Sequence, residues 1–381
     1  MTKVTGLGKG IRAPWTTKRC AWALAPEAPR NDDSQTMPGR RLRAASGRAR
    51  KARSTMKGPK DIQAGDQAVV SVDNLVKRYG DVLALDHFNL SIAKGEVFGL
   101  LGPNGCGKTT AMNCILQLLT YDKGDIRLFG ESMTPARYDL KRRIGVVPQQ
   151  VAVFDELTVA ENVDCFCSLY VSDKAARREM VNDAVEFVGL EDYRRVRPKK
   201  LSGGLLRRLN IACGIAHKPE LIFFDEPTVA VDPQSRNSIL DGILCLRDEG
   251  ATVVYTSHYM EEVEQICSRI MIMDGGRILA QGTNDQLKRM ISVGEKIVVE
   301  LLGVPDSRGR AAASTVRELP HVISSEFSDG ELRVACEASE HNLMDVLEAL
   351  RVARVQVGRV YSDPPTLNDV FLEITGRELR D

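Results

Sequence analysis

Largely apolar runs alternate along the middle of the chain with stretches whose apolar residues recur at helical spacing. Three such runs lie at 97–101, 221–224 and 251–257, and the stretch 205–217 before the second is predicted to be a helix. Runs with so little polar alternation are typical of strands buried on both faces of a sheet. The first run is followed by apolar residues at helical spacing: Met112, Ile115, Leu116 and Leu119. This alternation of strands and helices predicts an α/β fold with an open sheet.

The chain on either side of this central part has other patterns. Between about 135 and 200 helical patterns dominate, as over 158–170 and 173–188, and they predict a helical subdomain. After about residue 293, strand and helix patterns alternate and predict a small α+β domain over 293–381 with a ferredoxin-like layer. We expect its strands and helices at 296–302, 322–327, 331–336, 342–352 and 366–375. Because no catalytic cluster is evident in this domain, we expect a role in dimerisation or regulation.

Charge is distributed unevenly along the chain. The net charge is only +1, but residues 1–60 carry 15 Lys and Arg against three Asp and Glu, and the remaining residues carry 37 against 48. Residues 1–65 also have few apolar residues and no periodicity, which predicts a basic disordered extension. Three interpretations of it stay open: an arm that touches anionic lipid headgroups, a transit peptide, or an upstream start codon with translation beginning near Met56. The acidic balance of the rest argues against nucleic-acid binding.

Neither a membrane span nor a disulfide framework is expected from the sequence. No stretch approaches the ~18–20 apolar residues that cross a bilayer. The nine cysteines have no disulfide-like spacing, which fits a reducing cytosol. With 381 residues, 43% of them hydrophobic, the chain can bury one large core and a smaller one.

The segment GPNGCGKTT at 102–110 directly follows the first apolar run and fits the phosphate-binding pattern G-x-x-x-x-G-K-[ST]. Its glycines let successive backbone N–H groups point at phosphate oxygens, Lys108 can reach the β- and γ-phosphates, and the Thr109 hydroxyl can ligate Mg²⁺. The helix that follows places the positive end of its dipole at the same phosphates. We therefore predict that a nucleoside triphosphate with Mg²⁺ is bound by Gly102, Pro103, Asn104, Gly105, Cys106, Gly107, Lys108, Thr109 and Thr110.

Polar residues follow three further strand-like segments: Gln149, Asp225 with Glu226, and His258. Because ligands bind at the carboxyl ends of strands in open α/β sheets, we expect these side chains to converge on one edge. An acid at the end of a buried strand needs a cation, so Asp225 is expected to meet Mg²⁺ directly or through water. Gln149 can touch the metal or the attacking water, Glu226 can orient that water, and His258 can hydrogen-bond the γ-phosphate.

Further motifs follow in order: LSGG at 201–204, FFDEP at 223–227, and Asp232 shortly after. With the phosphate loop before them and His258 after them, they resemble the nucleotide-binding subunit of an ATP-binding cassette (ABC) transporter. The resemblance covers about residues 68–292. It implies a P-loop NTPase cassette at 66–292 that contains the helical signature subdomain at about 135–200.

The resemblance also implies roles for individual residues. Those it assigns to catalysis are Lys108, Gln149, Glu226 and His258. Those it assigns to Mg²⁺ are Thr109, Gln149 and Asp225. Outside the phosphate loop, those it assigns to ATP are Tyr79, Ser202, Gly203, Gly204 and Asp232. Tyr79 lies 23 residues before Gly102 and matches the aromatic residue that stacks on adenine.

The sequence contains one phosphate loop, one LSGG segment and no repeat at domain scale. In the family, LSGG closes over the γ-phosphate held by a second cassette packed head to tail. Ser202 and the amides of Gly203 and Gly204, at a helix start, would form an anion site with no phosphate of its own. We therefore expect an ATP-driven dimer, most simply a homodimer.

Three positions are unusual for the family pattern. Leu205 stands where Gln is usual, and Ala230 begins an Ala-Val-Asp segment where a small residue, Leu and Asp are frequent. We interpret both as subfamily variation without loss of activity. Cys106 is either a small tolerated residue or a reactive thiol, because a helix N-terminus lowers thiol pKa values. On the second interpretation, alkylation of Cys106 inhibits ATP hydrolysis and ATP protects the thiol.

The last motif, PTLNDVFLEITG at 365–376, resembles the tails of drug- and multidrug-exporter cassettes of the ABC-2 type. The resemblance implies the ATP-binding and hydrolysing subunit of an exporter, peripheral on the cytoplasmic face of the membrane. Such a subunit powers a separate polytopic permease. One alternative is a soluble ABC ATPase that acts on a cytosolic assembly without transport, and another is a regulatory ATP-binding module.

Overall fold

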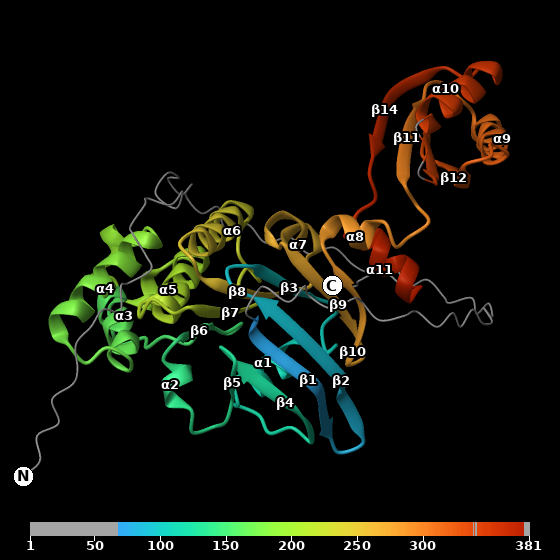
Figure 1. The fold of residues 1–381 in the computed structure, drawn as a ribbon. Coiled ribbons are helices and arrows are strands. Elements are labelled where there is room, and N and C mark those ends of the chain that lie inside the picture. Colours follow the sequence, from blue (N-terminus) through green and yellow to red (C-terminus); the bar gives the residue numbers. More distant parts are fainter. Residues whose placement is uncertain (1–67, 338, 340, 377–381) are drawn as a thin grey trace, which may run out of the picture.

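The centre of the fold is a six-stranded sheet, seen in a computed structural model that describes residues 68–337, 339 and 341–376 (Figure 1). The strand order is β10-β9-β3-β8-β7-β6, in which β10 runs antiparallel to β9 and all other neighbours are parallel. The strands are β3 (Val97–Leu101), β6 (Ile144–Val147), β7 (Leu221–Asp225), β8 (Thr252–Ser257), β9 (Arg269–Asp274) and β10 (Arg277–Gly282). The extension expected at 1–65 lies outside the described residues.

Burial on both faces explains the unbroken apolar runs, because every residue of β3 and β7 is buried. In β7, Ile222 and Phe224 enter one core, and Leu221 and Phe223 enter another. The helices of the first core include α5 (Gly203–Ile215), α6 (Pro233–Asp248) and α7 (Met260–Ile266). The second core includes α1 (Lys108–Ile115). The α/β fold expected from the sequence is confirmed.

A second, antiparallel sheet covers the α1 side with the strand order β2-β1-β4-β5. Its strands are β1 (Ala68–Tyr79), β2 (Val82–Ala93), β4 (Lys123–Leu128) and β5 (Glu131–Ser132). Val70, Phe88 and Ile126 of this sheet share a core with Ala111 and Ile115 of α1. The helix that follows the phosphate loop is therefore fixed by both sheets.

The helical subdomain contains α3 (Val159–Ser168) and α4 (Lys174–Phe187), followed by short 3₁₀ helices at Glu191–Tyr193 and Pro198–Lys200. The short helix α2 (Tyr138–Lys141) precedes it and packs through Leu140 into the core around α1. A capping box starts α3, because Thr158 Oγ1 accepts the Glu161 N–H and the Glu161 carboxylate accepts the Thr158 N–H. The helices expected at 158–170 and 173–188 are thus present, with shorter ends. Like the other helices of the described residues, they lack the length and apolar character of a membrane span.

The C-terminal unit has the element order β11 (Glu295–Leu301), α9 (Asp306–Arg317), β12 (Val322–Ser328), β13 (Glu331–Cys336), α10 (Asn342–Val352) and β14 (Val357–Asp363). Its antiparallel sheet, β12-β13-β11-β14, shares a core with both helices. This βαββαβ order confirms the expected ferredoxin-like layer. The sequence did not predict α9, whose buried residues are mostly small, or β14, an edge strand with largely exposed side chains.

The last helix, α11 (Leu367–Thr375), returns to the cassette and packs beside α7 and α8 (Asn284–Lys288) (Figure 1). Leu367, Val370 and Phe371 are buried in the core that contains α5, α6 and α7. The Leu367 N–H donates to Glu264 Oε1 of α7 at 2.5 Å. The ferredoxin-like unit is therefore attached to the cassette at both of its ends.

Candidate active site

The phosphate loop connects β3 to α1 and needs glycine at defined positions. A Cβ at Gly102 would lie 2.3 Å from the Met273 carbonyl oxygen. Gly107 has a φ of +110°, and a Cβ there would lie 2.7 Å from the Ala84 carbonyl oxygen. The loop leads directly into α1, whose first turn has no side-chain cap, so backbone N–H groups of this turn face the loop. The local geometry is that of an anion-binding helix start.

The buried side chain of Lys108 is held by oxygen atoms of the residues that follow β3 and β7. Its Nζ donates to the Gly102 carbonyl at 2.8 Å and to the Pro103 carbonyl at 3.3 Å. It also forms an ion pair with Glu226 Oε1 at 3.2 Å. An ammonium group in this position can transfer its contacts to phosphate oxygens that enter the loop.

The carboxylate of Asp225, the last residue of β7, lies next to the loop and contacts two threonine hydroxyls. Thr109 Oγ1 lies 3.2 and 3.0 Å from its two oxygens, and Thr256 Oγ1 donates to Oδ1 at 2.7 Å. Carboxylate and hydroxyl oxygens are the hard ligands that Mg²⁺ prefers, so Thr109 and Asp225 fit a magnesium site. In the described parts of the chain no three His, Cys, Asp or Glu side chains cluster to hold a metal, so this Mg²⁺ would need phosphate and water ligands.

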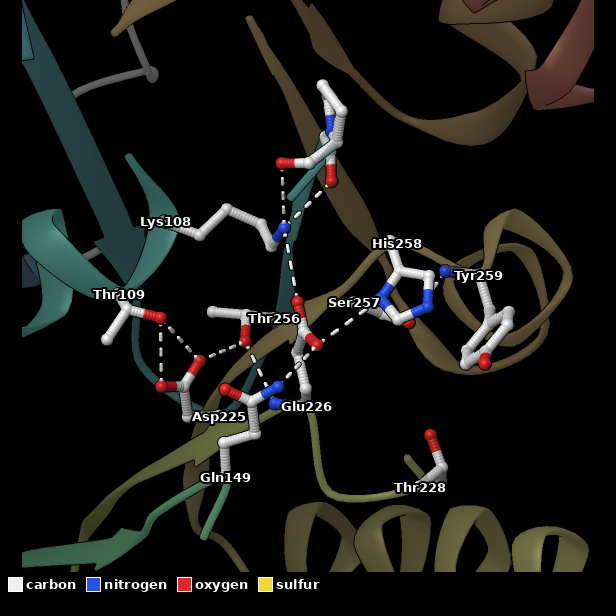
Figure 2. Close-up of polar contacts among 12 residues, drawn as sticks. Lys108, Thr109, Gln149, Asp225, Glu226, Thr228, Thr256, Ser257, His258 and Tyr259 are labelled. Carbon is white, nitrogen blue, oxygen red and sulfur yellow. Dashed lines mark hydrogen bonds and ion pairs between the residues drawn. The ribbon is translucent and has the colours of Figure 1, made fainter. Parts of the chain in front are cut away.

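Glu226 brings the other expected residues together (Figure 2). Its backbone is left-handed, with a φ of +45°, and its N–H donates to Thr256 Oγ1 at 3.0 Å. Gln149 Nε2 donates to Glu226 Oε2 at 3.1 Å, and His258 Nδ1 lies 3.3 Å from the same oxygen. With Lys108 on Oε1, the carboxylate has a partner on each oxygen. Left-handed backbone in a non-glycine residue is costly and concentrates at functional sites.

Arg207 of α5 is a further residue of this site that the sequence analysis did not identify. Its buried guanidinium donates to the carbonyl oxygens of Pro148 and Gln149 at 3.0 and 2.8 Å. It also donates to those of Glu226 and Pro227 at 2.7 and 2.6 Å. One side chain thus fixes the backbone that carries Gln149 and Glu226. No signal in the sequence singled out this residue, because the helical stretch 205–217 also contains Arg208, Asn210 and His217.

The LSGG residues and Asp232 form a second cluster, where α5 meets α6. Ser202 Oγ accepts the Leu205 N–H at 3.3 Å and caps α5, and Asp232 Oδ1 accepts the Ser235 N–H at 2.9 Å and caps α6. The Ser235 hydrogen bonds hold the pKa of Asp232 below its usual value. A Cβ at Gly204 would lie 2.4 Å from Ser235 Oγ, so glycine allows the two helix starts to touch.

Tyr79 lies apart from both clusters, at the end of β1. Its side chain is 47% exposed, and the Lys77 Nζ lies 5.0 Å from the ring centroid. An exposed aromatic ring backed by an ammonium group is accessible to a flat partner. Its contact with adenine stays a prediction.

Two family models match the chain. The ABC transporter model covers residues 85–229, and the model of the C-terminal domain of DrrA1-3-like ATP-binding proteins covers 282–375. The linearmycin resistance ATP-binding protein LnrL of Bacillus subtilis is 36% identical over 82% of this chain and 100% of the relative. The chain belongs to the ABC transporter family.

Other relatives place this ABC protein among the nucleotide-binding subunits of ABC-2 and drug-exporter type. The daunorubicin/doxorubicin resistance ATP-binding protein DrrA of Streptomyces peucetius is 34% identical over 82% of this chain and 94% of the relative. The Nod factor export ATP-binding protein I of Ralstonia nicotianae is 32% identical over 83% and 97%. A solved dimeric cassette bound to ADP and phosphate is 28% identical, with a TM-score of 0.52, over 56% of this chain and 98% of that chain.

Two of the unusual family positions have structural explanations. Leu205, which stands where the ABC pattern usually has Gln, is buried in the core around α5. Ala230 has a φ of +59°, a conformation that an alanine adopts at a cost of about 1 kcal/mol. Both substitutions are accommodated without displacing Ser202 or Asp232 from their capping positions.

Of the two interpretations of Cys106, the structure favours the small tolerated residue over the reactive thiol. The side chain is only 3% exposed and packs into the core between the two sheets. Burial raises the pKa of the thiol, although the charge of Lys108 acts in the opposite direction. The helix start can activate a cysteine only if its sulfur faces solvent.

We expect Cys106 to react with iodoacetamide at pH 8 at least about tenfold more slowly than the half-buried Cys165, because both access and thiolate fraction are low. Pulsed alkylation of the folded chain followed by peptide mass spectrometry measures both rates. Alkylation in denaturant is the control, since the two thiols should then react alike. Rapid labelling of folded Cys106 that ATP suppresses would contradict this account.

Proposed function

We propose that this chain is the ATP-binding and ATP-hydrolysing subunit of an ABC-2-type exporter. The observation that carries the proposal is the Glu226 carboxylate, which contacts Lys108, Gln149 and His258 at the mouth of a phosphate loop. The names of the relatives support export as the process, because they refer to resistance to linearmycin and daunorubicin and to Nod factor export.

Hydrolysis of ATP needs a positioned water and stabilisation of the charge on the γ-phosphate. We assign activation of the water to Glu226, whose orientation is set by Gln149 and His258. We assign Lys108 to the β- and γ-phosphates. Thr109 and Asp225 would hold Mg²⁺, which neutralises phosphate charge when bound.

We further propose that two copies assemble head to tail, so that the LSGG segment of each closes over the phosphates of the other. The backbone N–H groups of Gly203 and Gly204 begin α5 and form a helix start suited to an anion. No hydrogen-bond or ion-pair distance within the described chain ties these glycines to the phosphate loop, which is consistent with a partner's phosphate. The solved dimeric cassette bound to ADP and phosphate supports this arrangement.

The proposal includes a separate polytopic permease, with this chain on the cytoplasmic face of the membrane and without a nucleic-acid partner. The helical subdomain with α3 and α4 is the surface that we assign to the permease, and the resistance and export relatives support such a partner. The same relatives give no support to the alternative of a soluble ATPase without transport.

Glu226→Gln is expected to lower ATP turnover about 100-fold or more, because the amide cannot accept a proton from water. Affinity for ATP should stay equal or rise, because Lys108 loses a competing carboxylate. Phosphate release and binding of a fluorescent ATP analogue measure the two effects. Glu220→Gln, at the opposite end of β7 and paired with Arg143, is the matched control and should keep its turnover. Turnover by Glu226→Gln at the wild-type rate would refute the assigned role.

Glu226→Gln at micromolar concentration is expected to sediment as a dimer with ATP and Mg²⁺ and as a monomer without them. Adding Gly203→Glu should abolish the dimer, because the carboxylate would repel the partner's phosphate. A Cβ at Gly203 meets no atom closer than 4.0 Å, so this change leaves the fold intact. A monomer in ATP, or a dimer indifferent to Gly203→Glu, would argue against the head-to-tail assembly.

A further inference from the structure

A buried carboxylate, Glu262 of α7, lies close to the site but was not assigned a role above. Glu262 is only 2% exposed. Its Oε2 accepts hydrogen bonds from the Tyr255 hydroxyl at 2.7 Å and from Ser257 Oγ at 2.9 Å. Its Oε1 lies 3.3 Å from Arg236 Nε. Because a buried charge is tolerated only with such partners, this carboxylate ties α7 to β8 and α6.

The Tyr255 hydroxyl is a fixed donor in this group. Its side chain is fully buried in β8, and burial together with the nearby Glu262 carboxylate raises the pKa of the phenol well above its usual value. The phenol therefore stays protonated and donates to Glu262 across the physiological pH range. The end of β8 is held in this way just before it delivers His258.

His258 lies between Ser257 and Tyr259 and beside Glu226 (Figure 2), and the contacts of these two neighbours lead to Glu262. Ser257 Oγ, which donates to Glu262, accepts the Tyr259 N–H at 2.9 Å. The Tyr259 ring lies against the His258 imidazole, with ring centroids 4.0 Å apart. The Arg236 guanidinium lies 4.7 Å from the Tyr259 ring centroid. Both chain neighbours of His258 are therefore tied to one carboxylate: Ser257 directly, and Tyr259 through Ser257 and Arg236.

We propose that Glu262 is a positioning residue for His258 in ATP hydrolysis, an inference that rests on the function proposed above. His258 Nδ1 lies 3.3 Å from the Glu226 carboxylate, so a displaced imidazole alters the surroundings of the group assigned to activate water. Arg236 belongs to α6, which Asp232 caps, so the same contacts transmit the position of α6 to His258. The hydrogen bonds and the ion pair of Glu262 go to Tyr255, Ser257 and Arg236, none of which is assigned to ATP binding. Its loss should therefore affect turnover and leave ATP binding unchanged.

Glu262→Gln and Glu264→Gln are matched variants that test this role. Both remove one carboxylate charge from α7, but Glu264 pairs with Lys288 and accepts the Leu367 N–H instead of binding Tyr255, Ser257 or Arg236. We expect Glu262→Gln to lower kcat of the full-length chain about tenfold or more, because small displacements of catalytic groups have large effects on rate. The Kd for ATP should stay within about twofold, and Glu264→Gln should keep both values within about twofold.

A second variant and a double variant separate positioning from general loss of stability. The Arg236 side chain is about 30% exposed, so Arg236→Gln should fold, and we expect it to lower kcat at constant Kd as Glu262→Gln does. In a His258→Ala background, Glu262→Gln should lower the residual kcat by no more than about twofold, because the two residues act as a unit. Thermal unfolding of each variant monitors the fold.

The outcomes distinguish this inference from the function on which it rests. If the wild-type chain hydrolyses ATP and Glu226→Gln abolishes this activity, the proposed function is supported, regardless of the effect of Glu262→Gln. If Glu262→Gln and Glu264→Gln then have the same kcat, or if Glu262→Gln lowers kcat by the same factor with and without His258, the positioning role is wrong. Absence of hydrolysis by the wild-type chain would instead overturn the proposed function.

Discussion

Two carboxylates, Asp225 and Glu226, follow one another at the end of the fully buried strand β7, and each is only 6% exposed. Charges so placed destabilise a fold unless donors surround them. The partners come from distant parts of the chain. Thr109 and Thr256 donate to Asp225, and Lys108, Gln149 and His258 contact Glu226. The strand order β3-β8-β7-β6 brings these segments to one edge of the sheet. The arrangement of the α/β layer therefore surrounds two adjacent acids with polar partners, and it places the phosphate loop beside them.

Buried charges one layer farther out support this edge by the same principle. Arg207 of α5 binds four backbone carbonyls on the two segments that carry Gln149 and Glu226. Glu262 of α7 accepts hydrogen bonds from Tyr255 and Ser257, at the end of the strand that leads to His258. The helices on this face of the sheet thus do more than bury apolar surface. They set the backbone of the strand ends from which the candidate catalytic side chains project.

Much of the fold and of the candidate site could be predicted from the sequence, because phosphate binding requires certain residues at fixed spacing. A phosphate loop needs glycine at 102 and 107, and parallel strands end at one edge, so Glu226 and His258 were expected together. Arg207 and Glu262 were not predicted, because their partners are backbone carbonyls and side chains of other elements. The sequence left two interpretations of Cys106 open, because the direction in which a loop side chain points depends on packing between two sheets. Helix α9 was not predicted for a related reason: apart from Val316, its buried residues are only glycine and alanine.

The central claim is that the energy of ATP hydrolysis at this edge drives a partner in the membrane. The most direct measurement is purification of the tagged full-length chain from native membranes in mild detergent, with the co-purifying chains identified by mass spectrometry. The account predicts stoichiometric recovery of a polytopic membrane protein. Recovery only from the soluble fraction, together with cytosolic partners, would contradict it.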